Sequence, residues 1–194
     1  MDKSDKPSTF NNTVAYVKSF IKDKNVASVT PTAANVVRQI CDRMDFSRDI
    51  TVVEYGAGTG VFTFEILARM TPGSRLLTFE TNHELAARLK NTSDNRLIVT
   101  EESAELVGKI MRENDLSDAD YVLSGIPFSF LDPELRVSLV KNTHQCLAVG
   151  GEFLAYQASW LMKDTITEVF GNMETDSYMM NLPPMFLMQA KKVG

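Results

Sequence analysis

Apolar and polar residues follow a helical period at the start of the chain and then alternate between strand-like and helical segments. Residues 10–24 place their apolar side chains about one helical turn apart, which predicts an amphipathic helix. Pro31 opens a second predicted helix over residues 31–44. Strands are predicted at 50–54, 75–79, 96–100, 121–124, 152–157, 173–178 and 185–191, and helices at 61–70, 82–91, 103–113, 132–147 and 160–170.

This alternation predicts an α/β fold of the doubly wound type, with a mostly parallel seven-stranded sheet covered by helices on both faces. Only a short link, through Asn181-Leu182-Pro183-Pro184, separates the last two strands, so we expect an antiparallel hairpin at the edge of the sheet, with the last strand antiparallel. Residues 25–194 are predicted to form one domain. Residues 1–24 add a polar tail and the amphipathic helix.

The composition is that of an ordinary globular protein, with 44% hydrophobic and 23% charged residues over 194 positions. The net charge of −5 makes a nucleic-acid partner less expected, because binding to phosphates depends on basic residues. No signal-type segment or 18-residue apolar run occurs, which predicts a cytoplasmic protein, with peripheral contact at the inner membrane surface left open. Cys41 and Cys146 are read as reduced and buried, and no metal site is expected from two histidines.

The sequence VVEYGAGTGVF at residues 52–62 carries the strongest chemical signal. A buried strand ends at Glu54, and Gly56, Gly58 and Gly60 lead directly into a helix. Glycines let a chain turn sharply and let a ligand approach its backbone closely. Val61 takes the place of the third glycine of the nicotinamide-binding fingerprint, and the Lys-Ser/Thr pair of a P-loop is absent. Glu54 would either meet an ammonium group of the ligand or orient the loop.

Two further strand ends carry polar residues that suit an adenosyl ligand. Glu80 ends the second strand, where an acidic side chain accepts hydrogen bonds from both ribose hydroxyls. After the third strand, Ser103, and next to it Glu102, would meet the adenine amine. Ser103 fits equally well as the cap of the following helix.

The loop SGIPF at residues 124–128 ends the fourth strand and should face the reacting group, since ligands of such sheets bind beyond the carboxyl ends of the strands. Pro127 would stiffen the loop. Phe128 would form one wall of an acceptor pocket, or it would pack in the core.

In order and spacing, VVEYGAGTGVFT, LLTFE and SGIPF resemble the Class I S-adenosylmethionine-dependent methyltransferases. The most similar branches are the bacterial phospholipid N-methyltransferases, which act on phosphatidylethanolamine and similar amino-lipids, and the ribosomal RNA adenine dimethyltransferases. The segments VASVTPT at 26–32 and LPP at 182–184 resemble the lipid branch. The RNA branch carries an Asn whose amide meets the target amine where this chain has Gly125, and it appends a helical domain.

The resemblance implies S-adenosylmethionine as cofactor and S-adenosylhomocysteine as product. It implies no metal. The cofactor-binding residues expected are Glu54, Gly56, Ala57, Gly58, Gly60, Glu80, Thr81, Glu102, Ser103, Ala104 and Ser124. The candidates for the acceptor pocket are Ser124, Pro127, Phe128 and Tyr16. No catalytic base is evident from the sequence, and the candidates besides solvent are Tyr16, Ser124, His144 and Tyr178.

The function expected is N-methylation of an amino-lipid headgroup. The alternatives are an enzyme similar to the rRNA adenine N6-methyltransferases, a methyltransferase for another small acceptor, and a module that binds the cofactor without catalysis. In the lipid hypothesis Lys18, Lys22 and Lys24 approach an anionic membrane surface while the apolar side of the N-terminal helix enters it. Otherwise that helix folds over the cofactor as a lid.

Overall fold

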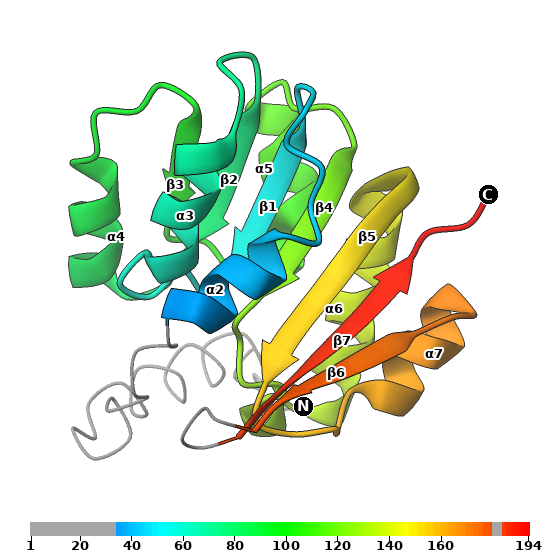
Figure 1. The fold of residues 1–194 in the computed structure, drawn as a ribbon. Coiled ribbons are helices and arrows are strands. Elements are labelled where there is room, and N and C mark those ends of the chain that lie inside the picture. Colours follow the sequence, from blue (N-terminus) through cyan, green and yellow to red (C-terminus); the bar gives the residue numbers. More distant parts are fainter. Residues whose placement is uncertain (1–33, 180–183) are drawn as a thin grey trace, which may run out of the picture.

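The computed structural model describes residues 34–179 and 184–194, which form a seven-stranded sheet with the order β3-β2-β1-β4-β5-β7-β6 (Figure 1). The strands are β1 Thr51–Tyr55, β2 Arg75–Phe79, β3 Leu97–Thr100, β4 Ala119–Ser124, β5 Leu147–Gln157, β6 Glu174–Tyr178 and β7 Met185–Lys191. The pairs β1–β2, β2–β3, β1–β4 and β4–β5 are parallel. The pairs β5–β7 and β6–β7 are antiparallel, which confirms the predicted sheet and its terminal hairpin.

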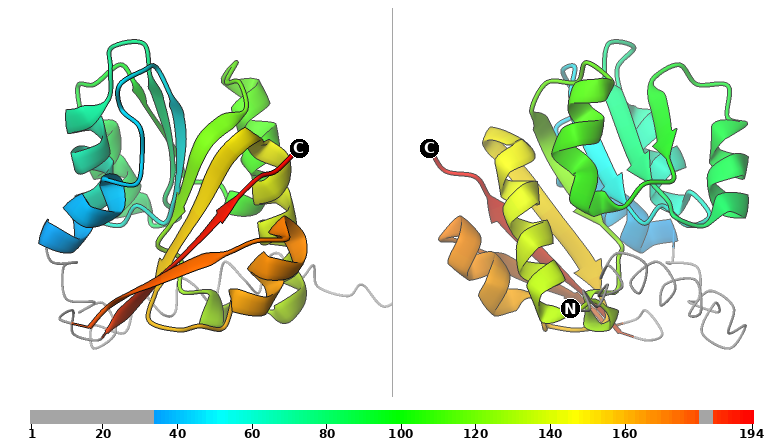
Figure 2. Two further views of the ribbon diagram at one scale, coloured as in Figure 1. Left: turned by 45° about the vertical axis from the view of Figure 1, so that its right-hand side comes forward. Right: turned by 180° about the vertical axis from the view of Figure 1, so that it is seen from behind.

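Helices cover both faces of the sheet (Figure 2). They are α2 Ala34–Cys41, α3 Val61–Arg69, α4 His83–Lys90, α5 Val107–Glu113, α6 Pro133–Cys146 and α7 Lys163–Phe170. Helices α5, α6 and α7 pack on one face in a core that includes Val53, and α2 and α3 pack on the other in a core that includes Val52. Successive residues of β1 thus enter opposite cores, as expected of a central strand buried on both faces.

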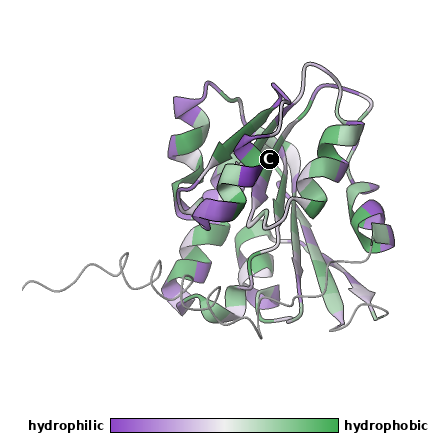
Figure 3. Cartoon of the chain, turned by 90° about the vertical axis from the view of Figure 1, so that its left-hand side faces the viewer, coloured by the Kyte–Doolittle hydropathy of each residue, from purple (hydrophilic) through white to green (hydrophobic). Residues whose placement is uncertain are grey.

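Apolar residues gather on the strands and on the helix sides turned toward them, as Figure 3 shows. In α6, for example, Leu139, Val140 and Thr143 are buried while Lys141 is exposed. In the part of the chain that the structure describes, no helix is long and apolar enough to span a bilayer. The helix predicted over residues 10–24, the start of the one predicted over 31–44, and the tail before them lie outside the described residues.

The start of β5 differs from the sequence prediction by five residues, 147 against 152. Strand β5 begins at Leu147, directly after α6, so Gly150 and Gly151 lie inside the strand rather than in a turn before it. Gly150 has φ +86°, and a Cβ on Gly151 would lie 2.8 Å from the carbonyl oxygen of Ala119. These glycines produce an irregularity in the β4–β5 pairing between Ala119 and Tyr121, where only glycine allows the two backbones to approach so closely.

Candidate functional site

The strand order reverses at β1, which has β2 on one side and β4 on the other. In open α/β sheets this switch point, at the carboxyl ends of the strands, is where ligands bind. The glycine loop after β1, Glu80 after β2 and the loop after β4 all lie at this edge. The fold therefore brings together the three main segments that the sequence selected.

The glycine loop needs left-handed backbone at three positions. Gly56, Gly58 and Gly60 have φ values of +73°, +56° and +85°. The N–H groups of Gly56 and Ala57 donate to the carbonyl oxygen of Phe79, at 2.8 and 3.3 Å, so the loop is fastened to the end of β2. A Cβ on Gly58 would meet no protein atom within 4 Å. The backbone at Gly58 is therefore exposed to an open space, from which a ligand would approach the loop.

Glu80 joins the end of β2 to the glycine loop. Its Oε2 accepts a hydrogen bond from the Gly58 N–H at 2.7 Å, and its Oε1 accepts one from the Asn82 N–H at 2.8 Å. Burial raises the pKa of Glu80, and these two backbone hydrogen bonds oppose the rise. A carboxylate has about four lone-pair sites, so both oxygens keep capacity for further donors.

Glu54 lies beneath the loop and is 2% exposed. Its Oε2 accepts hydrogen bonds from the hydroxyls of Thr63 at 2.6 Å and Thr78 at 3.2 Å. Burial raises the pKa of Glu54 to about 7, and the two hydroxyls and the nearby Glu80 have smaller effects. Of the two roles considered from the sequence, this geometry favours orientation of the loop, because Glu54 ties the first turn of α3 to β2.

In the loop after β3, Ser103 acts as a cap, which is the second of the two roles considered for it from the sequence. Ser103 Oγ accepts from the Glu105 N–H at 3.4 Å and caps a short 3-10 turn at Ala104–Leu106. The hydroxyl also donates to Glu105 Oε2 at 3.2 Å. Glu102 is exposed and Ala104 is buried. Thr81, after Glu80, is half-buried.

The loop after β4 is held against the glycine loop. The Gly125 N–H donates to the Tyr55 carbonyl at 2.9 Å, and a Cβ on Gly125 would lie 3.5 Å from the Gly56 oxygen. Ser124 is fully buried, and its Oγ accepts from the Ile126 N–H at 3.4 Å. Pro127 is exposed.

Phe128 has no exposed surface and packs in the core beneath α6 and α7, in a 3-10 turn at Phe128–Phe130. Of the two alternatives considered from the sequence, a wall of the acceptor pocket and packing in the core, this placement favours the second. The turn directs Phe128 inward, and Phe130, two residues later, is 44% exposed.

Gln157 was missed from the sequence. It ends β5 at the same edge, is 4% exposed, and its Oε1 accepts a hydrogen bond from the Phe128 N–H at 3.3 Å. Among the described residues, its Nε2 is the buried side-chain nitrogen or oxygen without a hydrogen-bond partner. A polar residue that ends a buried strand beside the predicted acceptor loop was the available signal.

The candidate proton acceptors are separated by the fold. His144 lies in the last turn of α6, which leads into the start of β5, so it lies at the opposite edge of the sheet. There it packs edge-on against Phe170, and burial lowers its pKa. This position corrects its inclusion among the candidates. Tyr178, at the end of β6, lies at the correct edge, but burial raises its pKa above 10.0, so it is protonated near neutral pH. Tyr16 is outside the described residues.

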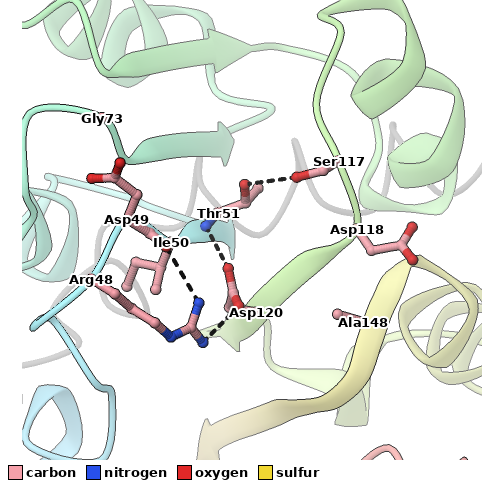
Figure 4. A pocket seen from close by; sticks show the side chains of 9 residues that line it. All are labelled: Arg48, Asp49, Ile50, Thr51, Gly73, Ser117, Asp118, Asp120 and Ala148. Carbon is pink, nitrogen blue, oxygen red and sulfur yellow. Dashed lines mark hydrogen bonds and ion pairs between the residues drawn. The ribbon is translucent and has the colours of Figure 1, made fainter.

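A hollow lies at the amino ends of the strands, away from these loops (Figure 4). Asp120 pairs with Arg48 at 2.8 Å and accepts from the Thr51 N–H at 2.8 Å. These contacts join the starts of β1 and β4, so Asp120 and Arg48 have a structural role there. In the described parts of the chain, no group of His, Cys, Asp and Glu side chains is arranged to hold a metal ion.

Solved structures share this fold. The N-methyltransferase NodS from Bradyrhizobium japonicum WM9, in complex with S-adenosyl-L-homocysteine, is 13% identical with a TM-score of 0.68, covering 93% of this chain and 98% of that one. The 1,6-didemethyltoxoflavin-N1-methyltransferase of Burkholderia thailandensis, with bound S-adenosylhomocysteine, is 15% identical with a TM-score of 0.67, covering 100% and 94%. The chain thus shares the fold of the Class I S-adenosylmethionine-dependent methyltransferases.

A curated relative is more similar in sequence. The chain is 28% identical over 170 residues to the ornithine lipid N-methyltransferase of Singulisphaera acidiphila. The aligned region covers 86% of this chain and 88% of that protein. No family model matches the sequence. The open space at Gly58 and the free lone pairs of Glu80 fit a ribose-bearing methyl donor, S-adenosylmethionine, as the cofactor.

Proposed function

We propose that the chain transfers a methyl group from S-adenosylmethionine to the amine of an amino-lipid headgroup such as that of phosphatidylethanolamine. The observation that carries this proposal is the 28% identity to an ornithine lipid N-methyltransferase across most of both chains. The backbone after β4 agrees with it, because Gly125 offers no side-chain amide of the kind that the RNA adenine dimethyltransferases use.

In this proposal the cofactor lies over the carboxyl ends of β1 and β2. Glu80 accepts hydrogen bonds from the ribose hydroxyls while it keeps its bond to the Gly58 N–H. Glu54 holds the loop from below. The other residues assigned to the cofactor are Gly56, Ala57, Gly60, Thr81, Glu102, Ser103, Ala104 and Ser124.

The bound cofactor supplies a methyl group on a sulfonium, a good leaving group that a neutral amine displaces in line. The headgroup nitrogen is an ammonium near neutral pH, and it must lose a proton to become the neutral amine that reacts. Tyr178 carries a raised pKa and Ser124 is buried, so solvent at this edge is the proton acceptor we assign. The protein then contributes alignment of the amine and exclusion of water from the methyl group.

The membrane contact expected of residues 1–24 stays part of this proposal, with Lys18, Lys22 and Lys24 toward anionic lipid. The proposal also includes a methyltransferase domain that begins at residue 25. It includes an enzyme that works from the cytoplasm at the membrane surface.

The test is methyl transfer from isotope-labelled S-adenosylmethionine to three acceptors, namely vesicles that contain ornithine lipid, vesicles that contain phosphatidylethanolamine, and ribosomal RNA. We expect labelled lipid and unlabelled RNA. Label in RNA and none in lipid would refute the proposal. A Gly58→Val variant, whose side chain would fill the open space at the loop, is the inactive control.

A further inference from the structure

Large exposed apolar side chains gather at the edge of the sheet that carries the site. Phe130, Trp160, Leu161 and Met179 are 44%, 39%, 44% and 65% exposed. They follow β4, β5 and β6, which all end at this edge. We call these four residues the carboxyl-end rim. They are half of the eight large hydrophobics that the described residues expose.

The rim residues come from segments that contact one another. The Phe128 N–H bonds to Gln157 at the end of β5, which connects the loops after β4 and β5. The ring of Trp160 lies 4.2 Å from that of Phe186, centroid to centroid. Phe186 pairs with Gln157 on one side and Ser177 on the other, two residues before Met179. Figure 1 shows the ends of β5 and of the β6–β7 hairpin together at the lower edge.

The rim lies on the acceptor side of the site. The glycine loop and Glu80 follow β1 and β2, whereas the rim follows strands on the other side of β1 in the sheet order. A lipid headgroup that approaches this edge keeps its acyl chains in the bilayer, so the surface around the acceptor entrance must rest against lipid. Exposed aromatic and aliphatic side chains fit that environment.

We propose that the carboxyl-end rim is the surface that contacts the bilayer and delivers the amino-lipid to the site, an inference that rests on the proposed function. The charges beside it are mixed, with Lys163 next to Asp164, and Asp132 two residues beyond Phe130. Contact through the rim therefore depends on apolar insertion and needs no anionic lipid.

Trp160 is the single tryptophan of the chain, so its fluorescence reports on the rim alone. The probe is vesicles of neutral phosphatidylcholine, with and without bromine on the acyl chains, added to the full chain. We expect a blue shift of the emission and quenching by the brominated lipid, both retained at 0.5 M salt. Protein that floats with vesicles while its emission stays unchanged binds through another surface, and that result would overturn the proposal. So would the absence of binding to the neutral vesicles, because the anionic contact proposed for residues 1–24 would then be the whole of the membrane contact.

Substitutions distinguish binding through the carboxyl-end rim from binding caused by any exposed apolar side chain. Leu161→Ser and Met179→Ser should each lower partition into vesicles about tenfold, as expected for a large apolar side chain that loses its burial. Val149→Ser and Val193→Ser are the matched controls, because these valines are 71% and 63% exposed at the opposite edge. Equal losses in both pairs, or none in the rim pair, would contradict the proposal.

A soluble acceptor distinguishes failure of this inference from failure of the proposed function. The Leu161→Ser/Met179→Ser variant should lose methylation of lipid in vesicles and keep methylation of a short-chain, monomeric amino-lipid. Loss on both acceptors would contradict a docking role for the rim. If the rim binds vesicles but no amino-lipid is methylated, the proposed function fails while the rim remains a lipid-contacting surface.

Discussion

Glu54 offers a sharp test of the structure beneath the glycine loop. Its described partners are the neutral hydroxyls of Thr63 and Thr78, and burial raises its pKa from 4.5 to about 7. Between these values the unfolded chain has released a proton that the folded chain still binds. The free energy of unfolding therefore falls as pH rises through this range, by about 1.4 kcal/mol per pH unit and about 3 kcal/mol in all.

The perturbation is Glu54→Gln. The neutral amide keeps an oxygen that accepts from Thr63 and Thr78, but it does not ionise. The difference in unfolding free energy between variant and wild type should be near zero at pH 4, below both pKa values, and should reach about 3 kcal/mol in favour of the variant at pH 8. Urea unfolding at half-unit steps of pH measures it, with Glu84→Gln, an exposed carboxyl on α4, as the control. Parallel pH profiles of wild type and Glu54→Gln would refute the reasoning.

Three further predictions concern the glycine loop and the thiols. In Gly60→Ala the new Cβ would lie 2.7 Å from Phe64 and 2.8 Å from a methyl of Leu89. We expect a loss of about 2 kcal/mol in thermal unfolding, and an unchanged melting temperature would contradict this packing. In Gly58→Ala the free energy of unfolding should fall by about 1 kcal/mol, because the positive φ is the only unfavourable feature of the change. The same variant should bind S-adenosylhomocysteine more weakly in a titration. Unchanged affinity would place the cofactor elsewhere. Burial raises the pKa of Cys41 and Cys146 to about 12, so a thiol reagent at pH 8 should label neither until the chain unfolds, and stoichiometric native labelling would contradict this.

The sequence predicts an element correctly where the local pattern of apolar residues matches their burial in the fold. Strands β1 and β2 are apolar because both faces of the sheet are covered, so they could be recognised without their partners. The three glycines after β1 require positive φ, and Glu80 is placed by the length of one strand–helix–strand unit. The hairpin of β6 and β7 followed from a link too short for a crossover.

Other features depend on contacts between distant segments, which a local pattern does not carry. Phe128 turns inward because a 3-10 turn follows Pro127 and space is left beneath α6 and α7. Gly151 lies within β5 because the backbone of Ala119 approaches it. The place of His144 at the far edge follows from the direction of α6, and the partner of Gln157 is 29 residues away in the chain.

The central claim is that the glycine loop and Glu80 together bind an adenosyl amino acid. Titration calorimetry of S-adenosylhomocysteine into the full chain tests it most directly, with Glu80→Gln as the variant and Glu84→Gln as the control of equal charge. We predict saturable binding that Glu80→Gln weakens at least tenfold, about 1.4 kcal/mol, because the amide replaces one acceptor oxygen with a donor. Absence of heat from the wild type, or equal affinity in both variants, would contradict the account.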